Sequence, residues 1–417
     1  MSESKPYAIS KEIVRAAYRS VKANKGAAGI DGESIAEFER NLEGNLYKLW
    51  NRMSSGSYFP PAVRAVEIPK PRGRGARTLG VPTVADRIAQ TVVKMYLEPE
   101  VEPVFHKDSY GYRPKRSALQ AVGKCRERCW KNDWVIDLDI KSFFDTLDHE
   151  LVMRVVRRHT DLTWIHLYVE RWLKAPLQRV DGVQVVPESG SPQGSAISPL
   201  LANLFLHYAF DAWMEREFPD IGFERYCDDV VVHCKSQPQA ENILSRITKR
   251  LAECRLEVNE AKTRIVYCKD KRRACSHEHE QFDYLGYTFR PRLCKAGRNG
   301  GHFVGFNPAI SSEACKEISG TIRGWCLQLR SEQSLDDLAR ETNATVRGWI
   351  NYYGRYFPSR LHSTLRRIDQ YLVRWAQRKY KRLKRRPTRA WRFLVGVMKR
   401  EPRLFAHWVS PRQFVAG

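Results

Sequence analysis

The stretch Phe223-Glu-Arg-Tyr-Cys-Asp-Asp-Val-Val-Val-His-Cys234 decides how the rest of the chain is interpreted. It holds two short runs of strand character, and the three valines after Asp229 are β-branched residues typical of strands. We expect Asp228 and Asp229 to occupy the turn of a β-hairpin. Adjacent carboxylates repel each other unless a cation joins them, and a hard ion such as Mg²⁺ prefers oxygen ligands. Most Asp-Asp turns are solvated surface turns, so the metal interpretation requires a third carboxylate.

The third carboxylate is expected from the segment Trp134-Val-Ile-Asp-Leu-Asp-Ile140. Its apolar residues alternate as in a strand, so Asp137 and Asp139 share the opposite face. An amphipathic helix is predicted after residue 148. A carboxylate at the end of a buried strand, before a turn into a helix, is a usual position for metal chemistry in mixed folds. Asp139 is therefore the predicted partner of the Asp228-Asp229 pair.

Composition limits the classes of protein that fit. The chain has 417 residues and a formal net charge of +24, which is typical of nucleic-acid-binding proteins. A membrane-surface protein is the alternative, but no apolar run of about 18 residues is long enough to span a bilayer. The N-terminus lacks the apolar segment of a secretion signal. The ten cysteines show no Cys-x-x-Cys spacing, so we expect reduced thiols and a cytoplasmic location, with no membrane partner.

Three further segments have the composition of nucleic-acid contacts. Residues 69–77 place four cations around two glycines between two predicted strands, which suits a flap over phosphates. Residues 105–117 mix aromatic, glycine and cationic residues, as in surfaces that stack on bases; Arg113 and Lys115 are its candidate RNA-binding residues. Residues 189–199 form a turn-rich neutral loop that brings Gln193 and a bare backbone near a nucleotide. Read alone, residues 69–77 fit a solvated basic loop better than a flap, and residues 189–199 fit an ordinary loop between a strand and a helix.

The C-terminal region is predicted to be helical from about residue 311. Leu361, Leu365, Ile368, Leu372 and Trp375 form one apolar stripe, which we interpret as the core of a helical bundle. The other faces are basic, with thirteen Lys or Arg and a single acidic residue between positions 371 and 403. Arg374 and Arg378 are candidate RNA-binding residues in this segment. A solvated helix face is the alternative, but it leaves these charges without anions to balance them.

A carboxylate cluster of Asp139, Asp228 and Asp229 on adjacent strands could hold two Mg²⁺ ions about 3.5–4 Å apart. One ion would lower the pKa of an attacking 3′-hydroxyl, and the other would stabilise the departing pyrophosphate. Such a reaction depends on positioning and charge stabilisation more than on covalent chemistry. With the basic segments, the cluster predicts a template-directed nucleotidyltransferase.

The ordered motifs resemble those of reverse transcriptases, and more specifically group II intron reverse transcriptase/maturases. The resemblance is carried by residues 25–31, 68–71, 109–114, 139–145, 191–194, 226–229, 282–286 and 347–353, which span nearly the whole chain. It implies an α+β, right-hand polymerase: fingers and palm with an antiparallel sheet, then an all-α thumb/maturase domain. The implied boundaries are an N-terminal extension and start of the fingers (1–62), fingers (63–130), palm (131–305, with a fingers-returning segment near 150–190), thumb/maturase (306–386) and a short basic DNA-binding-like tail (387–417).

The resemblance also implies roles for individual residues. Asp139 and Asp228 are implied metal ligands, with Asp229 supporting and the Ile140 carbonyl as a further ligand. The implied nucleotide-binding residues are Lys70, Arg77, Phe144, Gln193 and Lys262. Phe144 matches the steric gate, whose ring would clash with a ribose 2′-hydroxyl and so favour DNA synthesis. The implied primer and template contacts are Tyr226, Cys227, Leu285 and Gly286. Arg347 and Trp349 belong to the implied maturase signature that binds RNA.

The implied function is RNA-directed DNA polymerisation with two Mg²⁺ ions, Mn²⁺ being an alternative. The implied partners are intron or other template RNA, a DNA primer or target and dNTPs, with intron splicing assistance and retromobility; the oligomeric state is open, a dimer included. The sequence departs from the family at Cys227, where alanine is common. No cysteine zinc pairs of a His-Asn-His nuclease follow Pro387, so we do not expect DNA cleavage. Two alternatives stay open: a reverse transcriptase repurposed for defence or repair, and an RNA-binding splicing factor with an inactive polymerase site.

Overall fold

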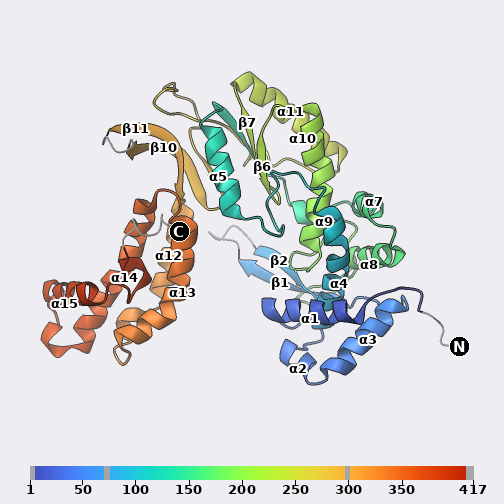
Figure 1. The fold of residues 1–417 in the computed structure, drawn as a ribbon, viewed down its shortest axis with the longest axis horizontal. Coiled ribbons are helices and arrows are strands. Elements are labelled where there is room, and N and C mark those ends of the chain that lie inside the picture. Colours follow the sequence, from blue (N-terminus) through green and yellow to red (C-terminus); the bar gives the residue numbers. More distant parts are fainter. Residues whose placement is uncertain (1–4, 70–75, 296–300, 410–417) are drawn as a thin grey trace. The chain divides into compact units, whose positions relative to one another are not determined.

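The computed structural model describes residues 5–69, 76–295 and 301–409. The chain folds into two compact units. The first unit contains Met1–Ala121 and Ile136–Arg264, and the second contains Val122–Val135 and Ile265–Gly417. Helices and strands are mixed in the first unit, while the second ends in a helical bundle (Figure 1). The predicted α+β class is therefore confirmed.

The first unit begins with three helices, of which the first and third pack on a longer fourth one and the second packs on the third. Ser10 caps the first helix by accepting a hydrogen bond from the Glu12 backbone, and Ser34 forms a capping box with Glu37. The apolar face of α1 packs against α4 (Figure 1). These elements are α1 (Lys11–Asn24), α2 (Ile35–Glu39), α3 (Leu42–Ser54) and α4 (Val84–Val101).

A small mixed sheet lies beside this helical layer. Its strand order is β2-β1-β4-β5, with β1 antiparallel to β2 and parallel to β4. Arg77, a predicted triphosphate contact, pairs by its backbone with Ile68. Lys70 lies outside the described residues. The strands are β1 (Val63–Pro69), β2 (Ala76–Val81), β4 (Leu177–Gln178) and β5 (Gln184–Val185).

A second sheet carries the predicted carboxylates. Its order is β6-β7-β3-β8, and β6 and β7 form the expected antiparallel hairpin. The boundary between the two units passes through α5, β3 and the start of β8. The strands are β3 (Trp134–Leu138), β6 (Phe223–Tyr226), β7 (Asp229–Cys234) and β8 (Arg264–Tyr267). The neighbouring helices are α5 (Ala118–Cys129), α6 (Phe143–Thr146), α7 (His149–His159), α8 (Thr163–Leu173), α9 (Ser198–Leu206), α10 (Ala212–Glu217) and α11 (Gln237–Glu253). A π-helical turn, His207–Asp211, joins α9 to α10.

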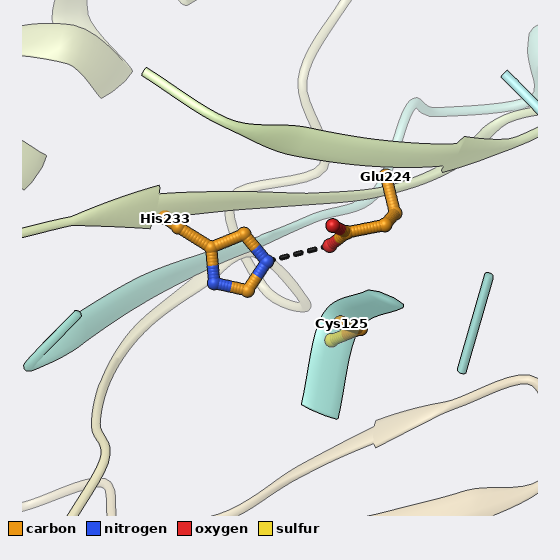
Figure 2. A group of neighbouring side chains, drawn as sticks. All are labelled: Cys125, Glu224 and His233. Atoms are coloured by element: carbon orange, nitrogen blue, oxygen red, sulfur yellow. Dashed lines mark hydrogen bonds and ion pairs between the residues drawn. The ribbon is translucent and has the colours of Figure 1, made fainter. Parts of the chain in front are cut away.

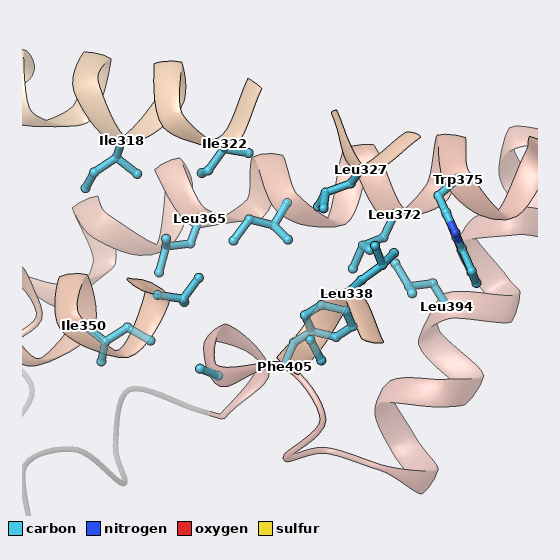
Figure 3. Packing of buried hydrophobic residues seen from close by; sticks show 14 of the residues in the cluster. Ile318, Ile322, Leu327, Leu338, Ile350, Leu365, Leu372, Trp375, Leu394 and Phe405 are labelled. Carbon is cyan, nitrogen blue, oxygen red and sulfur yellow. The ribbon is translucent and has the colours of Figure 1, made fainter. Parts of the chain in front are cut away.

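Among its described residues, the second unit contains a three-stranded sheet of order β11-β10-β9, the α-helices α12 to α15 and most of α5. The elements are β9 (Phe282–Tyr284), β10 (Tyr287–Lys295), β11 (His302–Ile310), α12 (Ser312–Gly324), α13 (Leu335–Tyr353), α14 (Pro358–Lys379) and α15 (Pro387–Arg400). All five residues of the predicted apolar stripe on α14 are buried, which confirms their role as bundle core. Figure 3 shows Leu365, Leu372 and Trp375 among leucine, isoleucine and phenylalanine side chains of the other helices.

Candidate active site

The hairpin turn differs by one residue from the prediction. Tyr226 pairs with Asp229, so the two-residue turn consists of Cys227 and Asp228, and Asp229 is the first residue of β7. Cys227 is buried and adopts φ 58°, a left-handed conformation that is uncommon for a residue other than glycine. The prediction that Asp228 and Asp229 form the turn is therefore wrong. The two carboxylates instead leave the backbone from a turn residue and a strand residue.

A buried polar network supports this turn from below. The Arg225 guanidinium donates to both carboxylate oxygens of Asp211, at 2.7 and 2.5 Å. Its Nη1 also donates to Asn203 Oδ1 at 2.9 Å and to the Cys227 carbonyl at 3.0 Å. Arg225 and Asp211 are both fully buried, so the ion pair has little contact with solvent. Because one guanidinium holds both the π-turn and the hairpin turn, the position of Asp228 depends on Arg225.

The Ser109–Pro114 motif packs against the hairpin turn. Tyr110 N donates to the Arg225 carbonyl at 2.8 Å, so this segment runs along β6. Gly111 reaches the turn itself, since an added Cβ would lie 2.5 Å from the Cys227 nitrogen. Asn203 Nδ2 donates to the Gly111 carbonyl at 2.6 Å. Glycine at position 111 is thus required by close backbone approach.

Asp139 lies directly after β3, whose neighbour in the sheet is β7. Its backbone is fixed on both sides: Asp139 N donates to Thr263 Oγ1 at 3.2 Å, and its carbonyl accepts from Asn259 N at 2.8 Å. Ile140, the predicted backbone ligand, forms a bridge with Val258. The segment that contains Lys262 is thereby held beside Asp139.

The negative charges of Asp139 and Asp228 act on the third predicted carboxylate, Asp229. Loss of hydration, followed by the negative charges of Asp228 and Asp139, raises the pKa of Asp229 from 3.8 to about 6. Lys262 opposes this rise, and its Nζ lies 3.0 Å from Asp139 Oδ1. Part of Asp229 remains exposed although its carboxyl group has lost hydration, so a cation can reach it from solvent. The structure therefore brings the three aspartates into one electrostatic cluster, and it adds Lys262, which the sequence had assigned to nucleotide binding.

The predicted nucleotide loop, residues 189–199, connects α6, the short helix that carries Phe144, to the small sheet. Gly80 N of β2 donates to the Gln193 carbonyl at 2.8 Å, and Ser191 N donates to the Phe144 carbonyl at 2.7 Å. The half-buried Phe144 ring packs against Phe143 with centroids 5.4 Å apart. The loop that carries Gln193 is thus hydrogen-bonded both to β2, which contains Arg77, and to α6, which contains the predicted steric gate Phe144.

Sequence reasoning missed the residues that hold this loop. Gln90 Oε1 accepts from Ser195 Oγ at 2.7 Å and from Ala196 N at 2.8 Å. Its Nε2 donates to Asp86 Oδ2 at 2.9 Å. Burial raises the pKa of Asp86 to about 6, although Trp172 and Tyr58 also donate to its carboxylate. The only sequence signal was two polar residues one helical turn apart, on the helix face that also carries Val93 and Leu97.

Phe282–Phe289, predicted as one strand with a central glycine, is a hairpin. Leu285 (φ 50°) and Gly286 (φ 76°) form the two-residue turn between β9 and β10, and Tyr284 pairs with Tyr287. Positive φ at both positions is the conformation that favours tight hairpins. Tyr352 Oη donates to the Leu285 carbonyl at 2.8 Å. The predicted primer-contacting turn and the 347–353 maturase motif are thus in direct contact within the second unit.

The predicted RNA-binding residues fall into three groups. Arg347, Arg374 and Arg378 are exposed on the helices of the second unit. Trp349 instead stacks on Trp325 with ring centroids 5.5 Å apart, so the two Arg-Gly-Trp repeats meet through their tryptophans.

Arg113 and Lys115 lie in the first unit and differ from each other. Lys115 is exposed. Arg113 is 8% exposed, its Nη2 lies 2.8 Å from Glu102 Oε1, and its Nη1 donates to the carbonyls of His106 and Ser109. The expectation that Arg113 contacts RNA is therefore corrected: its guanidinium is bound within the protein and shapes the 105–117 segment.

The β6–β7 hairpin carries a second buried polar pair away from its turn. His233 Nε2 lies 2.5 Å from Glu224 Oε2, and both side chains are fully buried (Figure 2, which also labels Cys125 of α5). His233 N also donates to the Gly222 carbonyl at 2.9 Å. This pair fixes the two strands to each other at their distal end, so the tip of the hairpin projects from a rigid base.

The donor set at the tip fits a hard divalent cation. Asp228 and Asp139 lie close enough to Asp229 for their charges to act on it, and oxygen ligands are those that Mg²⁺ prefers. Lys262 balances one negative charge on Asp139, which leaves an excess of negative charge in the cluster. A divalent ion at this point would compete with Lys262 for Asp139.

Two family models match the chain. Residues 68–289 match the reverse transcriptase (RNA-dependent DNA polymerase) family, and residues 315–394 match the group II intron, maturase-specific domain. Among the described residues, no helix is both long and apolar enough to cross a membrane.

Similar proteins come from bacteria and yeast. Protein YkfC of Escherichia coli is 31% identical over 62% of this chain and 78% of its own length. Group II intron-encoded protein LtrA of Lactococcus lactis is 32% identical over 48% of this chain and 33% of its own length. The putative COX1/OXI3 intron 1 protein of Saccharomyces cerevisiae is 31% identical over 49% of this chain and 24% of its own length. The chain therefore belongs to the reverse transcriptase family, among the members that carry a group II intron maturase-specific domain.

Proposed function

We propose that the chain is an RNA-directed DNA polymerase. The observation that carries this proposal is the electrostatic cluster of Asp139, Asp228 and Asp229 at adjoining strand ends, in a chain of the reverse transcriptase family. In the right-hand description, residues 63–130 are the fingers, 131–305 the palm and 306–386 the thumb. The exposed cations of residues 374–403 would lie along the phosphates of the bound RNA.

The protein groups have distinct parts in this reaction. Asp139 and Asp228 would hold two Mg²⁺ ions, with Asp229 and the Ile140 carbonyl in support. When bound, these ions lower the pKa of a primer 3′-hydroxyl and stabilise the leaving pyrophosphate. Lys262 neutralises charge on Asp139 and would turn to the incoming triphosphate.

Nucleotide selection would depend on the loop and turn beside the cluster. Gln193 would contact the incoming dNTP, because its loop is hydrogen-bonded to both β2 and the Phe144 turn. Lys70 and Arg77 would bind phosphate oxygens, and the ring of Phe144 would exclude a ribose 2′-hydroxyl. Tyr226, Cys227, Leu285 and Gly286 would contact the primer and template.

Primer extension on an RNA template with dNTPs tests this proposal. Asp228→Asn keeps the size of the side chain and removes its charge, and extension should fall by at least about 100-fold, the usual scale for losing a charge-stabilising group. Asp220→Asn, the same change at an exposed aspartate of the same unit, is the control and should extend normally. Equal extension by both variants would contradict the assignment of Asp228.

We also propose assistance of intron splicing, which rests on the maturase-specific domain at residues 315–394. Sequencing of the RNA that copurifies with the protein, followed by splicing of that RNA in vitro, tests this function. A structured intron whose splicing depends on the protein supports a maturase, with retromobility as its consequence. Extension activity without such an RNA would favour the repurposed enzyme, and splicing without extension would favour the splicing factor with an inactive polymerase site.

A further inference from the structure

A groove of about 1930 Å³ opens within the second unit. Its walls come from α5, the β10–β11 hairpin and the junction between α13 and α14. Small-molecule pockets usually measure about 300–1,000 Å³, so the groove is large for such a ligand. The 347–353 maturase motif reaches it through Ile350 and Asn351, but none of the individual residues proposed above for catalysis, nucleotide binding or RNA binding lines it. The groove thus requires an explanation of its own.

The charge of the groove favours an anion. Its cationic side chains are Arg126, Lys271, Arg272, Arg273, Lys295 and Arg355, and its acidic side chains are Glu127, Asp133 and Asp270. The acids already have basic partners: Arg273 lies close to both Asp270 and Asp133, and Glu127 lies 3.7 Å from Lys124. In the part of the chain that the structure describes, the other five lining cations form no ion pair. The groove therefore presents positive charge to a ligand.

Arg126 and Trp130 form a fixed platform on one wall. The Arg126 guanidinium lies 4.3 Å from the centre of the Trp130 ring, and its Nε donates to Asn307 Oδ1 at 2.9 Å. Trp130 Nε1 donates to the Phe306 carbonyl at 3.0 Å, while the residue is 46% exposed. A ring that is fixed at its edge and still accessible can stack on a base at little cost in side-chain entropy.

The β10–β11 hairpin also contributes an aromatic ring. Phe303 of β11 lines the groove and is accessible over 40% of its surface. Residues two and four positions apart on a strand share a face, so Phe303 lies on the same face of the hairpin as Asn307, the partner of Arg126. Two exposed aromatic rings, Trp130 and Phe303, with cations around them, are typical of grooves that bind single strands. A duplex suits this groove less well, because paired bases do not expose their faces.

We propose that this groove binds a single-stranded segment of nucleic acid. Lys271 and Arg272 contact its phosphates, and Trp130 and Phe303 stack on its bases. The inference rests on the proposed function for the class of ligand, but the site is separate from the carboxylate cluster. It would hold a single-stranded stretch of the RNA or DNA on which the protein acts.

The test compares two double variants of the full chain with the same change in charge. Lys271→Glu/Arg272→Glu changes the groove, and Lys235→Glu/Lys249→Glu changes exposed cations of the first unit. Fluorescence anisotropy measures binding of labelled oligouridylate, oligothymidylate and a duplex, each of about 20 nucleotides. Loss of two single-strand phosphate contacts should reduce the salt slope by about 1.4 and the affinity at 0.1 M salt by about 25-fold. Phe303→Ala should weaken single-strand binding by about tenfold and leave duplex binding unchanged.

The outcomes separate this site from the polymerase. The proposal is supported if the groove variant loses binding of oligouridylate or oligothymidylate but keeps binding of the duplex. The stronger of the two losses identifies RNA or DNA as the ligand. Equal losses in the groove and control variants, or a greater loss of duplex than of single strand, would overturn it. Primer extension by the same proteins is measured separately. If the wild-type protein binds single strands in the groove but does not extend a primer, the proposed polymerase function is contradicted and the groove proposal is not. Unchanged melting temperatures exclude misfolding as the cause of lost binding.

Discussion

Gln90→Leu is predicted to impair nucleotide binding more than chemical turnover. Gln90 is buried in α4 and links Asp86 to Ser195 and Ala196 of the loop that carries Gln193. Leucine has a similar volume but makes none of these three hydrogen bonds. The loop would then be displaced in part of the molecules. The apparent nucleotide affinity falls in proportion to the fraction of molecules whose loop remains in place.

The magnitude follows from the bonds that are lost. A bond to a charged group contributes about 1.5–3 kcal/mol, and each buried donor left without an acceptor costs about 1–3 kcal/mol. Asp86 keeps its donors Tyr58 and Trp172, and leucine adds apolar contacts, so the net loss in unfolding free energy should be about 3 kcal/mol. If about 1.4 kcal/mol of this loss falls on the loop, the KM for dNTP rises about tenfold.

Urea denaturation and steady-state primer extension measure the two effects. Stability should fall by about 3 kcal/mol, KM for dNTP should rise about tenfold and kcat should stay within about threefold. Gln237→Leu, at an exposed glutamine of the same unit, is the control and should change stability by less than about 0.5 kcal/mol. A variant that loses the predicted stability but keeps its KM would refute the reasoning, because Gln90 would then serve only the core.

Four further variants test other parts of the site. Asp86→Asn should remove a pH dependence of stability. The pKa of Asp86 is about 6 in the folded state and 3.8 in the unfolded state, so between these values the native state retains a proton that the unfolded state has lost. Urea denaturation should therefore show wild-type stability falling by about 2 kcal/mol more than that of the variant between about pH 4.5 and 7.5. Gly111→Ala places a Cβ 2.5 Å from the Cys227 nitrogen and should lower kcat at least about tenfold in primer extension, whereas Gly320→Ala, which meets nothing within 4 Å, should not. Arg225→Met leaves the carboxylate of Asp211 buried without its cation, and denaturation should show a loss of about 3–5 kcal/mol; a loss below about 1 kcal/mol would contradict that role. Phe144→Ala should raise kcat/KM for ribonucleotides relative to dNTPs by at least about tenfold, and an unchanged ratio would contradict the steric gate.

The sequence predicted well those features that depend on local periodicity. The alternation in residues 134–140 located β3 and placed Asp139 at its end, and the helical spacing of Leu361, Leu365 and Ile368 identified the bundle core. Both signals come from side chains that repeat along one element. The pattern alone therefore indicates which face is buried.

The errors concern register and partners. Cys227 adopts a left-handed conformation, which a sequence normally indicates by glycine or asparagine. Because cysteine gives no such signal, the hairpin turn was predicted one residue too late. Arg113 has the composition of an RNA contact, yet its partner Glu102 lies eleven residues away on another element. Composition does not show whether a guanidinium is buried or exposed. It also does not show whether the guanidinium has a partner inside the protein.

The contacts give a physical reason why the motifs occur together in one chain. Gly111 of the 109–114 motif meets the backbone of Cys227, and the maturase-motif residue Tyr352 donates to the carbonyl of Leu285. In both pairs, one motif supplies a tight turn and the other supplies the surface that fixes it. A turn with positive φ at non-glycine residues is costly in isolation and persists only when its surroundings hold it. The precision of the carboxylate cluster therefore depends on segments far away in the sequence, and a change in one motif acts through the other.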